Sequence, residues 1–225
     1  MNWDDLPDYL KNSDVEKYYQ NIKKKKIQLL IKRLFDMVFS SILLILLSPV
    51  FLYVSIKIKL DSEGPVFFKQ KRITLHGKEF EIFKFRTMKV ETNNFGSSIT
   101  LANDSRITKF GLKIRDKRID EIPQLINILI GDMSFVGTRP EVPKYVRMYT
   151  NEMYATLLLR AGVTSTASIC YKDESELIGS SINPDKVYEE IILPEKMKYN
   201  LNDIKEFSLL GDIKILINTV IAVIK

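Results

Sequence analysis

The chain of 225 residues has a single cysteine, Cys170, and a single histidine, His76. One cysteine excludes an internal disulfide framework and any metal site built from several cysteines, and it fits the reducing environment of a cytoplasm. His76 lies in Leu75-His76-Gly77-Lys78, a sequence typical of a turn between strands. The sequence therefore gives little reason to expect a catalytic histidine. Its candidate catalytic groups are expected among the other charged residues.

Several familiar motifs are also missing. No glycine-rich loop is followed by Lys-Ser or Lys-Thr, and no dinucleotide fingerprint occurs, which excludes the common nucleotide-binding loops. The only long apolar run begins too far from Met1 for a signal peptide and has no small-residue cleavage site, so we expect it to remain as an anchor. The formal net charge of +6 suits nucleic acid, anionic lipid or phosphorylated substrates. Because aromatic residues do not interleave with the basic clusters, we expect no nucleic-acid partner.

That apolar run is the one long stretch without charge, and it extends from Met37 to Ile56. A helix of about twenty apolar residues is long enough to cross a bilayer. Ser48-Pro49 lies near the middle of the run, where proline removes a backbone donor and clashes with the preceding turn. The sequence therefore predicts a bend, at which Ser48 satisfies backbone groups that Pro49 leaves unpaired.

Both flanks of the run are basic, so the charge rule gives no preferred direction of crossing. The basic residues of the flanks are Lys23 to Lys26, Lys32, Arg33, Lys57, Lys59, Lys69, Lys71 and Arg72. A bent hairpin that enters and leaves on the cytoplasmic side keeps both flanks in the cytoplasm. A single kinked span carries one flank across, and the residues of the run are compatible with either arrangement.

The rest of the sequence predicts helices and a few short strands. Val66-Phe67-Phe68 and Phe80 to Phe85 predict two strands joined through His76-Gly77. Apolar residues at helical spacing predict helix within residues 106–130, closed by Gly131.

The remaining predicted elements are a loop over 91–98, a helix within 141–161 that ends at Gly162, an extended piece over 167–171 and a helix over 184–202 interrupted near Pro194. The tail from 207 to 224 is mostly aliphatic. It suits either the membrane interface or a helix packed on the core.

The pair Asp120-Glu121 is the strongest candidate for chemistry. It stands before an amphipathic helix that has Pro123 in its first turn, where acidic residues commonly do no more than cap free amides and complement the helix dipole. The functional interpretation rests on the nearby cations Arg115, Lys117, Arg118 and Arg139. Arginines and helix amides hold phosphate, and an ionised aspartate can attack phosphorus when a divalent metal screens the repulsion.

Two further segments carry cations in patterns that suit phosphate. Lys84-Phe85-Arg86-Thr87-Met88 alternates charge with bulk, which predicts a strand with Lys84 and Arg86 on one face, either solvated or binding phosphate. In Gly137-Thr138-Arg139-Pro140, glycine and proline restrict the backbone around one arginine. The guanidinium fork of Arg139 can grip a phosphate in two places.

These segments resemble, in order, the motifs of the bacterial sugar transferase family of monotopic phosphoglycosyl transferases. The matching motifs are Lys32-Arg33-Leu34-Phe35-Asp36, Ser48-Pro49, Gly64-Pro65-Val66-Phe67-Phe68, Lys84-Phe85-Arg86-Thr87-Met88, Asp120-Glu121-Ile122-Pro123-Gln124-Leu125 with Asn127, and the run from Gly131 to Pro140. So many motifs in the family's order do not arise by chance.

The resemblance implies an α+β, mainly helical fold. We expect an N-terminal extension over 1–31, a re-entrant membrane helix over 32–60 broken at Ser48-Pro49, and a compact cytoplasmic catalytic domain over 61–225. That domain is expected to contain interfacial helices and a small β-hairpin. The implied location is the cytoplasmic face of the bacterial inner membrane, in contact with membrane lipids.

The resemblance also implies a reaction, in which a sugar 1-phosphate passes from a UDP-sugar to undecaprenyl phosphate with release of UMP, for downstream glycosyltransferases to extend. Asp120 matches the family's nucleophile, which forms a covalent phosphosugar intermediate. Glu121 and Mg²⁺ assist it, with Asp120 and Glu121 as metal ligands. Arg115 and Arg139 match positions that bind phosphate or substrate, and Lys84 and Arg86 are expected to add charge there.

The sequence departs from the family pattern at three places. Thr138 replaces a proline, Ala161-Gly162-Val163-Thr164-Ser165 replaces Pro-Gly-Ile-Thr-Gly, and Ser168-Ile169-Cys170-Tyr171 replaces Gln-Val-Asn-Gly. Contacts that the family makes through the last segment do not carry over. We place the chain among the small enzymes of the family. The alternative is a catalytically silent, membrane-anchored protein that binds anionic lipid or another polyanion.

Overall fold

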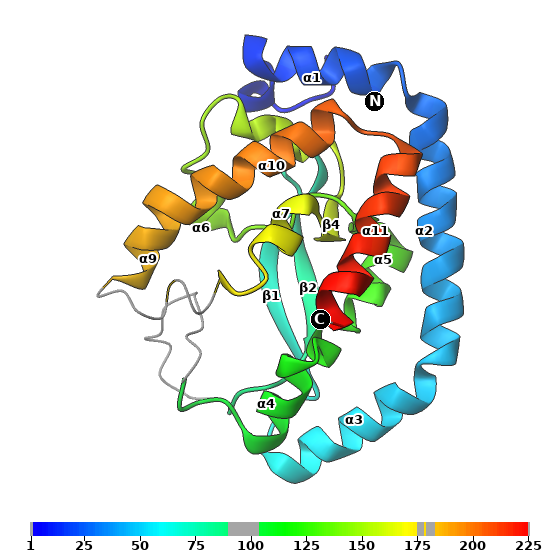
Figure 1. Ribbon diagram of the computed structural model, residues 1–225, viewed down its shortest axis with the longest axis vertical. Helices are drawn as coiled ribbons and strands as arrows, with labels where there is room; N and C mark the ends of the chain where they lie inside the picture. The colour runs from blue at the N-terminus through cyan, green and yellow to red at the C-terminus, as the bar shows by residue number, and fades with distance from the viewer. Residues whose placement is uncertain (1, 90–103, 175–177, 179–182, 225) are drawn as a thin grey trace.

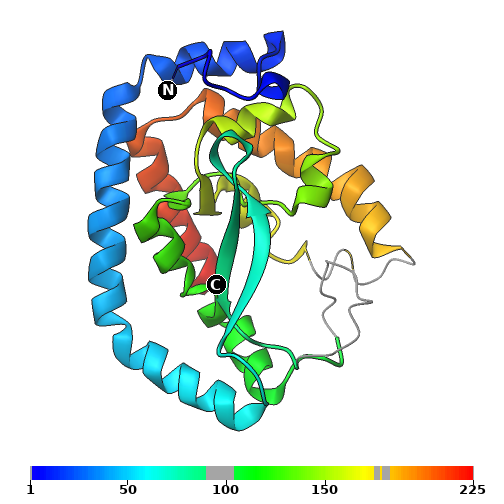
Figure 2. The same cartoon turned by 180° about the vertical axis from the view of Figure 1, so that it is seen from behind.

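The computed structural model describes residues 2–89, 104–174, 178 and 183–224. Within them the chain is mainly helical with a small β-hairpin, as the fold class predicted, and it also has a parallel two-stranded sheet that was not predicted. Figures 1 and 2 show a long bent helical arm, α2 followed by α3, along one side of a compact body. The predicted loop over 91–98 lies outside the described residues.

The bent arm consists of α2 (Lys26–Leu46) and α3 (Ser48–Asp61), which meet at an angle of 60°. Pro49 lies in the first turn of α3, where its missing N–H is tolerated. The carbonyl of Ile45, which a continuous helix would bond to residue 49, instead accepts the Ser48 hydroxyl at 2.8 Å. The predicted bend and the predicted role of Ser48 are confirmed.

Neither arm helix is long and apolar enough by itself to cross a membrane, and no other helix in the described residues is. The two together reach that length and hydropathy. Many large apolar side chains of the arm are exposed: Ile27, Leu30, Ile31, Leu34, Phe35, Met37, Val38, Phe39, Ile42, Ile45, Leu46, Leu52, Tyr53, Ile56 and Leu60. The arm therefore presents an extended apolar surface away from the body.

The predicted hairpin is confirmed as β1 (Phe67–Ile73) and β2 (Glu79–Phe85), antiparallel, with Phe67 opposite Phe85. His76 has a φ of 57° and Gly77 one of 77°, so the turn uses the left-handed conformations expected of His-Gly. Phe85 is buried and its ring lies 5.2 Å from that of Phe51 on α3. The hairpin thereby joins the arm to the body.

Helices α4 (Lys109–Asp116) and α5 (Gln124–Ile130) occupy the predicted helical region. Gly131 ends α5 with a φ of 98°, as predicted. The parallel strands β3 (Met133–Val136) and β4 (Ala161–Thr164) follow, and Ser134 pairs with Gly162.

Two predictions from the C-terminal half are wrong. Residues 141–161 contain a helix as predicted, the short α6 (Pro143–Val146), and a 3-10 helix over Met153–Leu158, but Gly162 lies inside β4 instead of ending a helix. Residues 167–171 were predicted to be extended, but α7 (Thr166–Cys170) is helical. Its first amides are bonded by Ser165 and by Asp203, which is distant in sequence.

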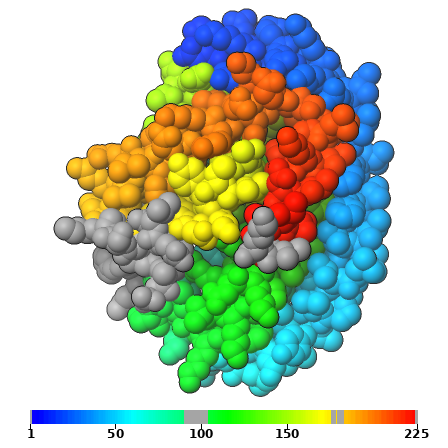
Figure 3. Space-filling model, in the orientation of Figure 1, coloured from blue at the N-terminus to red at the C-terminus, as the bar shows by residue number. Residues whose placement is uncertain are grey.

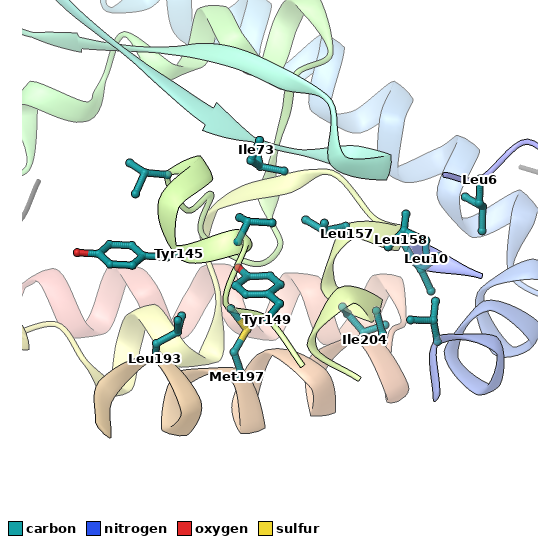
Figure 4. Packing of buried hydrophobic residues seen from close by; sticks show 14 of the residues in the cluster. Leu6, Leu10, Ile73, Tyr145, Tyr149, Leu157, Leu158, Leu193, Met197 and Ile204 are labelled. Atoms are coloured by element: carbon teal, nitrogen blue, oxygen red, sulfur yellow. The ribbon is translucent and has the colours of Figure 1, made fainter. Parts of the chain in front are cut away.

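The last elements are α9 (Pro184–Val187), a π-helical segment Tyr188–Ile192, α10 (Leu193–Lys205) and α11 (Leu209–Ile224). The π-helical segment is the predicted interruption before Pro194. The main core gathers around α10, where Leu193 and Met197 lie near Tyr145 and Tyr149, and Ile204 lies near Leu10 and Leu158 (Figure 4).

The N-terminal segment is part of the same core. Helix α1 (Ser13–Lys23) begins at Asn12, whose side chain accepts hydrogen bonds from Asp14 and Val15 amides. Its residues Val15, Tyr19 and Ile22 recur at helical spacing and are buried against α10 and residues 153–158.

Helix α11 packs between α2 and α7 (Figures 1 and 3). Its outer face exposes Leu210, Ile213, Ile217, Val220 and Val223. The tail is therefore both a packed helix and a second exposed apolar strip beside the arm.

Candidate active site

Asp120 and Glu121 lie in a 3-10 turn, Ile119–Glu121, directly before α5. The turn follows Arg118, which adopts a left-handed backbone with φ 56° and donates its Nη2 to the carbonyl of Lys172 at 2.9 Å. A non-glycine residue in this conformation is uncommon and costs free energy, so the reversal between α4 and the acidic pair is imposed by the fold. No side chain caps the 3-10 turn or α5, so capping does not explain the pair.

The Glu121 carboxylate is held between two cations. Its Oε1 accepts a hydrogen bond from Lys84 Nζ at 2.7 Å and another from Arg139 Nη2, and its Oε2 lies 3.3 Å from Arg139 Nη1. Burial acts to raise the pKa of Glu121, but Arg139 and Lys84 outweigh it and hold that pKa well below its usual value. Glu121 is therefore ionised at neutral pH, with both oxygens engaged.

The pKa values of the two cations that share Glu121 are shifted in opposite directions. Burial lowers the pKa of Lys84, and attraction to Glu121 offsets only part of that effect. The Glu121 carboxylate raises the pKa of Arg139, which burial opposes. Lys84, Arg139 and Arg115, whose charge also acts on Asp120, together carry one more positive charge than Glu121 and an ionised Asp120 cancel, so the site is suited to an anion.

The surroundings of the Asp120 carboxyl are opposite to those of Glu121, whose oxygens are bonded to cations. It is only 7% exposed, and its Oδ1 is buried without a hydrogen-bond partner. Burial raises the pKa of Asp120 to about 6, against the attraction of Lys84, while Glu121 adds to the rise and Arg115 and Arg139 reduce it. At neutral pH most of this carboxyl is ionised yet poorly solvated, which is the state that a nucleophilic carboxylate needs.

The loop that carries Arg139 is fixed by the β3–β4 pair. The amide of Gly137 donates to Thr164 O at 2.9 Å, and the amide of Gly162 donates to Thr138 O at 2.9 Å. A Cβ added to Gly162 would lie 2.1 Å from Gly137 N, so only glycine permits this approach. The Arg139 side chain, which also reaches Val163 O at 3.4 Å, is thereby directed at Glu121.

The other predicted phosphate-binding cations lie apart from Glu121. Arg115 on α4 is half-buried, and within the described part of the chain its side chain makes no ion pair, although its charge acts on Asp120. Arg86 follows β2, and its Nη2 donates to the carbonyl and hydroxyl oxygens of Ser62 at 2.6 and 3.0 Å. The structure therefore brings Lys84 and Arg139 together and gives Arg86 a different neighbour.

Gln124, close in sequence to the acidic pair, is a buried polar residue that sequence reasoning did not single out. It is fully buried, and neither its Oε1 nor its Nε2 has a partner. It stands four residues after Asp120 in a continuous right-handed turn, so both side chains leave the same face. The signal in the sequence was a polar residue on the apolar face of a predicted helix.

The acidic pair offers few ligands for Mg²⁺. No group of three or more His, Cys, Asp or Glu side chains that could hold a metal occurs in the described residues. Mg²⁺ is commonly bound by one or two carboxylates together with water and substrate phosphates. The Asp120 carboxylate, which no cation of the described residues bonds, suits such a ligand through one oxygen and keeps the other for attack, whereas both oxygens of Glu121 are engaged by cations.

Arg33 and Asp36 on α2 fix the arm beside the site. Arg33 donates to the last carbonyls of α5, those of Ile128 and Leu129, at 2.6 and 2.8 Å, which satisfies acceptors that the helix leaves open. The buried Asp36 accepts from the amide of Phe135 at 3.2 Å.

Lys32 makes the third tie between the arm and the body. Its Nζ donates to Val136 O at 2.9 Å and to Asp212 Oδ2 of α11 at 2.5 Å. One lysine thus joins α2, β3 and α11 at the edge of the loop that carries Arg139.

Several known proteins are similar to this chain in sequence. The bacterial sugar transferase family model matches residues 27–225. The UDP-glucose:undecaprenyl-phosphate glucose-1-phosphate transferase of Escherichia coli K12 is 34% identical over 195 residues, which is 85% of this chain and 39% of the relative.

Two further relatives differ in length. The UDP-N-acetylgalactosamine-undecaprenyl-phosphate N-acetylgalactosaminephosphotransferase of Aeromonas hydrophila is 34% identical over 84% of this chain and 43% of its own length. An uncharacterized sugar transferase of Bacillus subtilis, EpsL, is 41% identical over 63% of this chain and 69% of its own length. The chain thus spans less than half of the two enzymes whose names state a substrate.

Proposed function

Because the chain belongs to the bacterial sugar transferase family, we propose that it transfers a sugar 1-phosphate from a UDP-sugar to undecaprenyl phosphate and releases UMP. The names of the relatives from Escherichia coli and Aeromonas hydrophila support these two substrates. The reaction would be the first membrane step in assembling a surface glycan such as a capsule, exopolysaccharide, O-antigen or glycoprotein glycan. Downstream glycosyltransferases would consume the product.

The observation that carries the proposal is the buried, unpartnered oxygen of Asp120 in the field of the cations Lys84, Arg115 and Arg139. In the first step, Asp120 Oδ1 attacks the sugar-bearing phosphorus of the UDP-sugar. The bond between that phosphorus and the bridging oxygen breaks, and its electron pair leaves with UMP. Asp120 then carries the sugar phosphate as an acyl phosphate.

In the second step, a phosphate oxygen of the lipid attacks the same phosphorus. The bond to Asp120 breaks, the carboxylate is regenerated, and the sugar leaves on a lipid diphosphate. Lys84, Arg115 and Arg139 neutralise the donor phosphates in both steps, and Glu121 keeps two of these cations oriented. Two successive transfers through one carboxylate give ping-pong kinetics, with UMP released before the lipid reacts.

Mg²⁺ belongs to the same proposal, with Asp120 and the substrate phosphates as its ligands. When bound, the ion supplies positive charge that screens repulsion between carboxylate and phosphate. Glu121, which was also expected to be a metal ligand, is left out of this ligand set because its two oxygens are bonded to Lys84 and Arg139.

We place the protein at the cytoplasmic face of the membrane, with α2 and α3 as a re-entrant hairpin. The 60° bend and the basic residues on both flanks support a return to the side of entry. The exposed apolar residues of the arm and of α11 support contact with lipid. A lipid phosphate at headgroup level would then lie near the site.

The deciding experiment screens UDP-sugars for UMP release by the full chain in detergent with undecaprenyl phosphate and Mg²⁺. We expect turnover that requires both substrates, and a labelled sugar phosphate trapped on the wild type but not on Asp120→Asn. Binding of anionic lipid without UMP release from any UDP-sugar would favour a silent binding protein instead.

A further inference from the structure

Asn127 is a fully buried asparagine of α5, and its side chain bonds the backbone of β2. Its Nδ2 donates to the carbonyl of Glu81 at 2.8 Å, and its Oδ1 accepts a hydrogen bond from the amide of Phe83 at 2.9 Å. The side-chain amide thus offers β2 one donor and one acceptor, the same pair of bonds that a residue of a neighbouring strand would offer.

These two bonds lie on the edge of β2 that faces away from β1. Alternate residues of a strand direct their backbone groups to opposite edges. The amide of Arg86, directly after β2, donates to Val66 O at 2.9 Å, so the even-numbered residues of β2 face the other strand of the hairpin. Glu81 and Phe83 are therefore on the outer edge, and Asn127 binds that edge to α5.

The bonds of Asn127 join the two elements that carry the Lys84–Glu121 ion pair. Lys84 directly follows Phe83 on β2, and Glu121 lies three residues before Gln124, where α5 begins. Hydrophobic packing between α5 and β2 is non-directional, whereas the two hydrogen bonds to residues 81 and 83 fix the position of the strand along the helix. The apolar side chains of this contact are Leu125, Ile128, Phe80 and Ile82.

The geometry of the ion pair depends on where β2 lies. Lys84 Nζ is 2.7 Å from Glu121 Oε1, and Glu121 also holds Arg139. A lysine side chain has a flexible four-carbon stem, so a shift of β2 along α5 changes where the ammonium group lies relative to Glu121. A displacement of about 1 Å at a reacting site can cost about a hundredfold in rate.

We propose that Asn127 is a positioning residue for the transfer reaction. By holding β2 at one place on α5 it fixes Lys84 against Glu121, and it acts on the donor phosphates only through Lys84. This inference rests on the proposed function and adds to it a residue that touches neither substrate.

The test is a double-mutant cycle on the full chain in detergent. It measures the UMP burst without acceptor, with UDP-glucose or UDP-N-acetylgalactosamine as the donor, whichever the wild type uses. We expect Asn127→Ala to slow the burst about tenfold or more in the wild-type background but less than about twofold in Lys84→Met, because the residue through which Asn127 acts is then gone. A purely structural role would slow the burst by the same factor in both backgrounds. Denaturant unfolding of the same preparations reports folding.

Two further variants keep the test decisive. Asn127→Gln keeps the amide on a side chain longer by one methylene, so it should displace β2 and slow the burst in the same Lys84-dependent way even if Asn127→Ala does not fold. The control Asn200→Ala removes the same side chain from a buried place on α10, where Asn200 Nδ2 donates to the Met197 sulfur at 3.9 Å. It should leave the burst unchanged in both backgrounds.

The proposal is overturned if both Asn127 variants have a normal burst, or if they slow it equally with and without Lys84. It is also overturned if Lys84→Met by itself has a normal burst, since Asn127 would then have nothing to position. A wild type that releases no UMP refutes the proposed function itself and is a separate result.

Discussion

Asp120 and Glu121 are consecutive residues, but their carboxyl groups have opposite surroundings. Both Glu121 oxygens contact Lys84 or Arg139, whereas Asp120 Oδ1 is buried with no partner. Environments that push the pKa values of two neighbouring carboxyls apart commonly separate their roles. Here Glu121 has the surroundings of a fixed counter-ion and Asp120 those of a group that awaits a substrate.

The first prediction concerns pH. Burial raises the pKa of Asp120 to about 6, and only its ionised form attacks phosphorus. The rate of the UMP burst without acceptor should therefore be constant above about pH 7 and fall about tenfold per unit well below pH 6. Stopped-flow or quenched-flow measurement of UMP provides the profile. A burst rate that stays flat down to about pH 5 would contradict the role of Asp120.

The second prediction concerns stability. The pKa of Asp120 is higher in the folded protein than the usual 3.8, so the folded state binds the proton more tightly and stability falls as pH rises from about 4 to about 6. Asp120→Asn removes the buried charge and should stabilise the fold at about pH 7.5 by up to about 3 kcal/mol, with no gain near pH 4. Denaturant unfolding at both pH values measures the difference. A less stable variant at the higher pH would contradict the assigned burial.

The third prediction concerns the counter-ion. Glu121→Gln leaves Lys84 and Arg139 buried without their carboxylate, which should destabilise the fold by about 3 kcal/mol and lower the burst rate about a hundredfold. Unfolding and burst measurements on one preparation report both effects. The exposed Glu206→Gln is the matched control and should change neither. A normal burst rate in Glu121→Gln would show that the orientation of these cations is not needed.

The fourth prediction concerns the contact of the two glycines. In Gly162→Ala the new Cβ would lie 2.1 Å from Gly137 N, so the strands must separate and Arg139 must move. We expect a loss of more than about 2 kcal/mol in stability together with loss of the burst. Gly211→Ala is the control, because its Cβ meets only the Ser208 hydroxyl at 3.0 Å in a helix, where alanine is the better residue. Equal stability of the two variants would contradict the close approach.

The fifth prediction concerns the arm. If α2 and α3 return to the side of entry, cysteine reporters at Lys23 and Lys69 should both label from the cytoplasmic side. The exposed Cys170 must first be replaced by serine. Labelling of the two reporters from opposite sides would mean that the arm crosses the membrane as a kinked span.

Predictions from the sequence succeeded where the cause is local. Proline at 49 lacks a donor in any fold, Gly131 ends a helix through its own backbone freedom, and the alternation in Phe80 to Phe85 defines a strand face. They failed over 141–171, where the short strand β4 and the short helix α7 form because Gly162 meets Gly137 and Asp203 bonds Thr166. Such contacts join residues far apart in the chain and leave no local pattern.

The site also divides into features that are set by local sequence and features that depend on contacts between distant residues. The sequence by itself determined the acidic pair, the rigid loop around Arg139, the cations at 84 and 86, and the break at Ser48-Pro49, because each is a matter of residue type and spacing. Only the tertiary structure decided that Glu121 is the carboxyl bound by Lys84 and Arg139, that Asp120 keeps a free oxygen, and that Arg86 faces the end of α3. Burial and charge pairing arise when distant segments meet, so the distinct roles of these groups follow from packing.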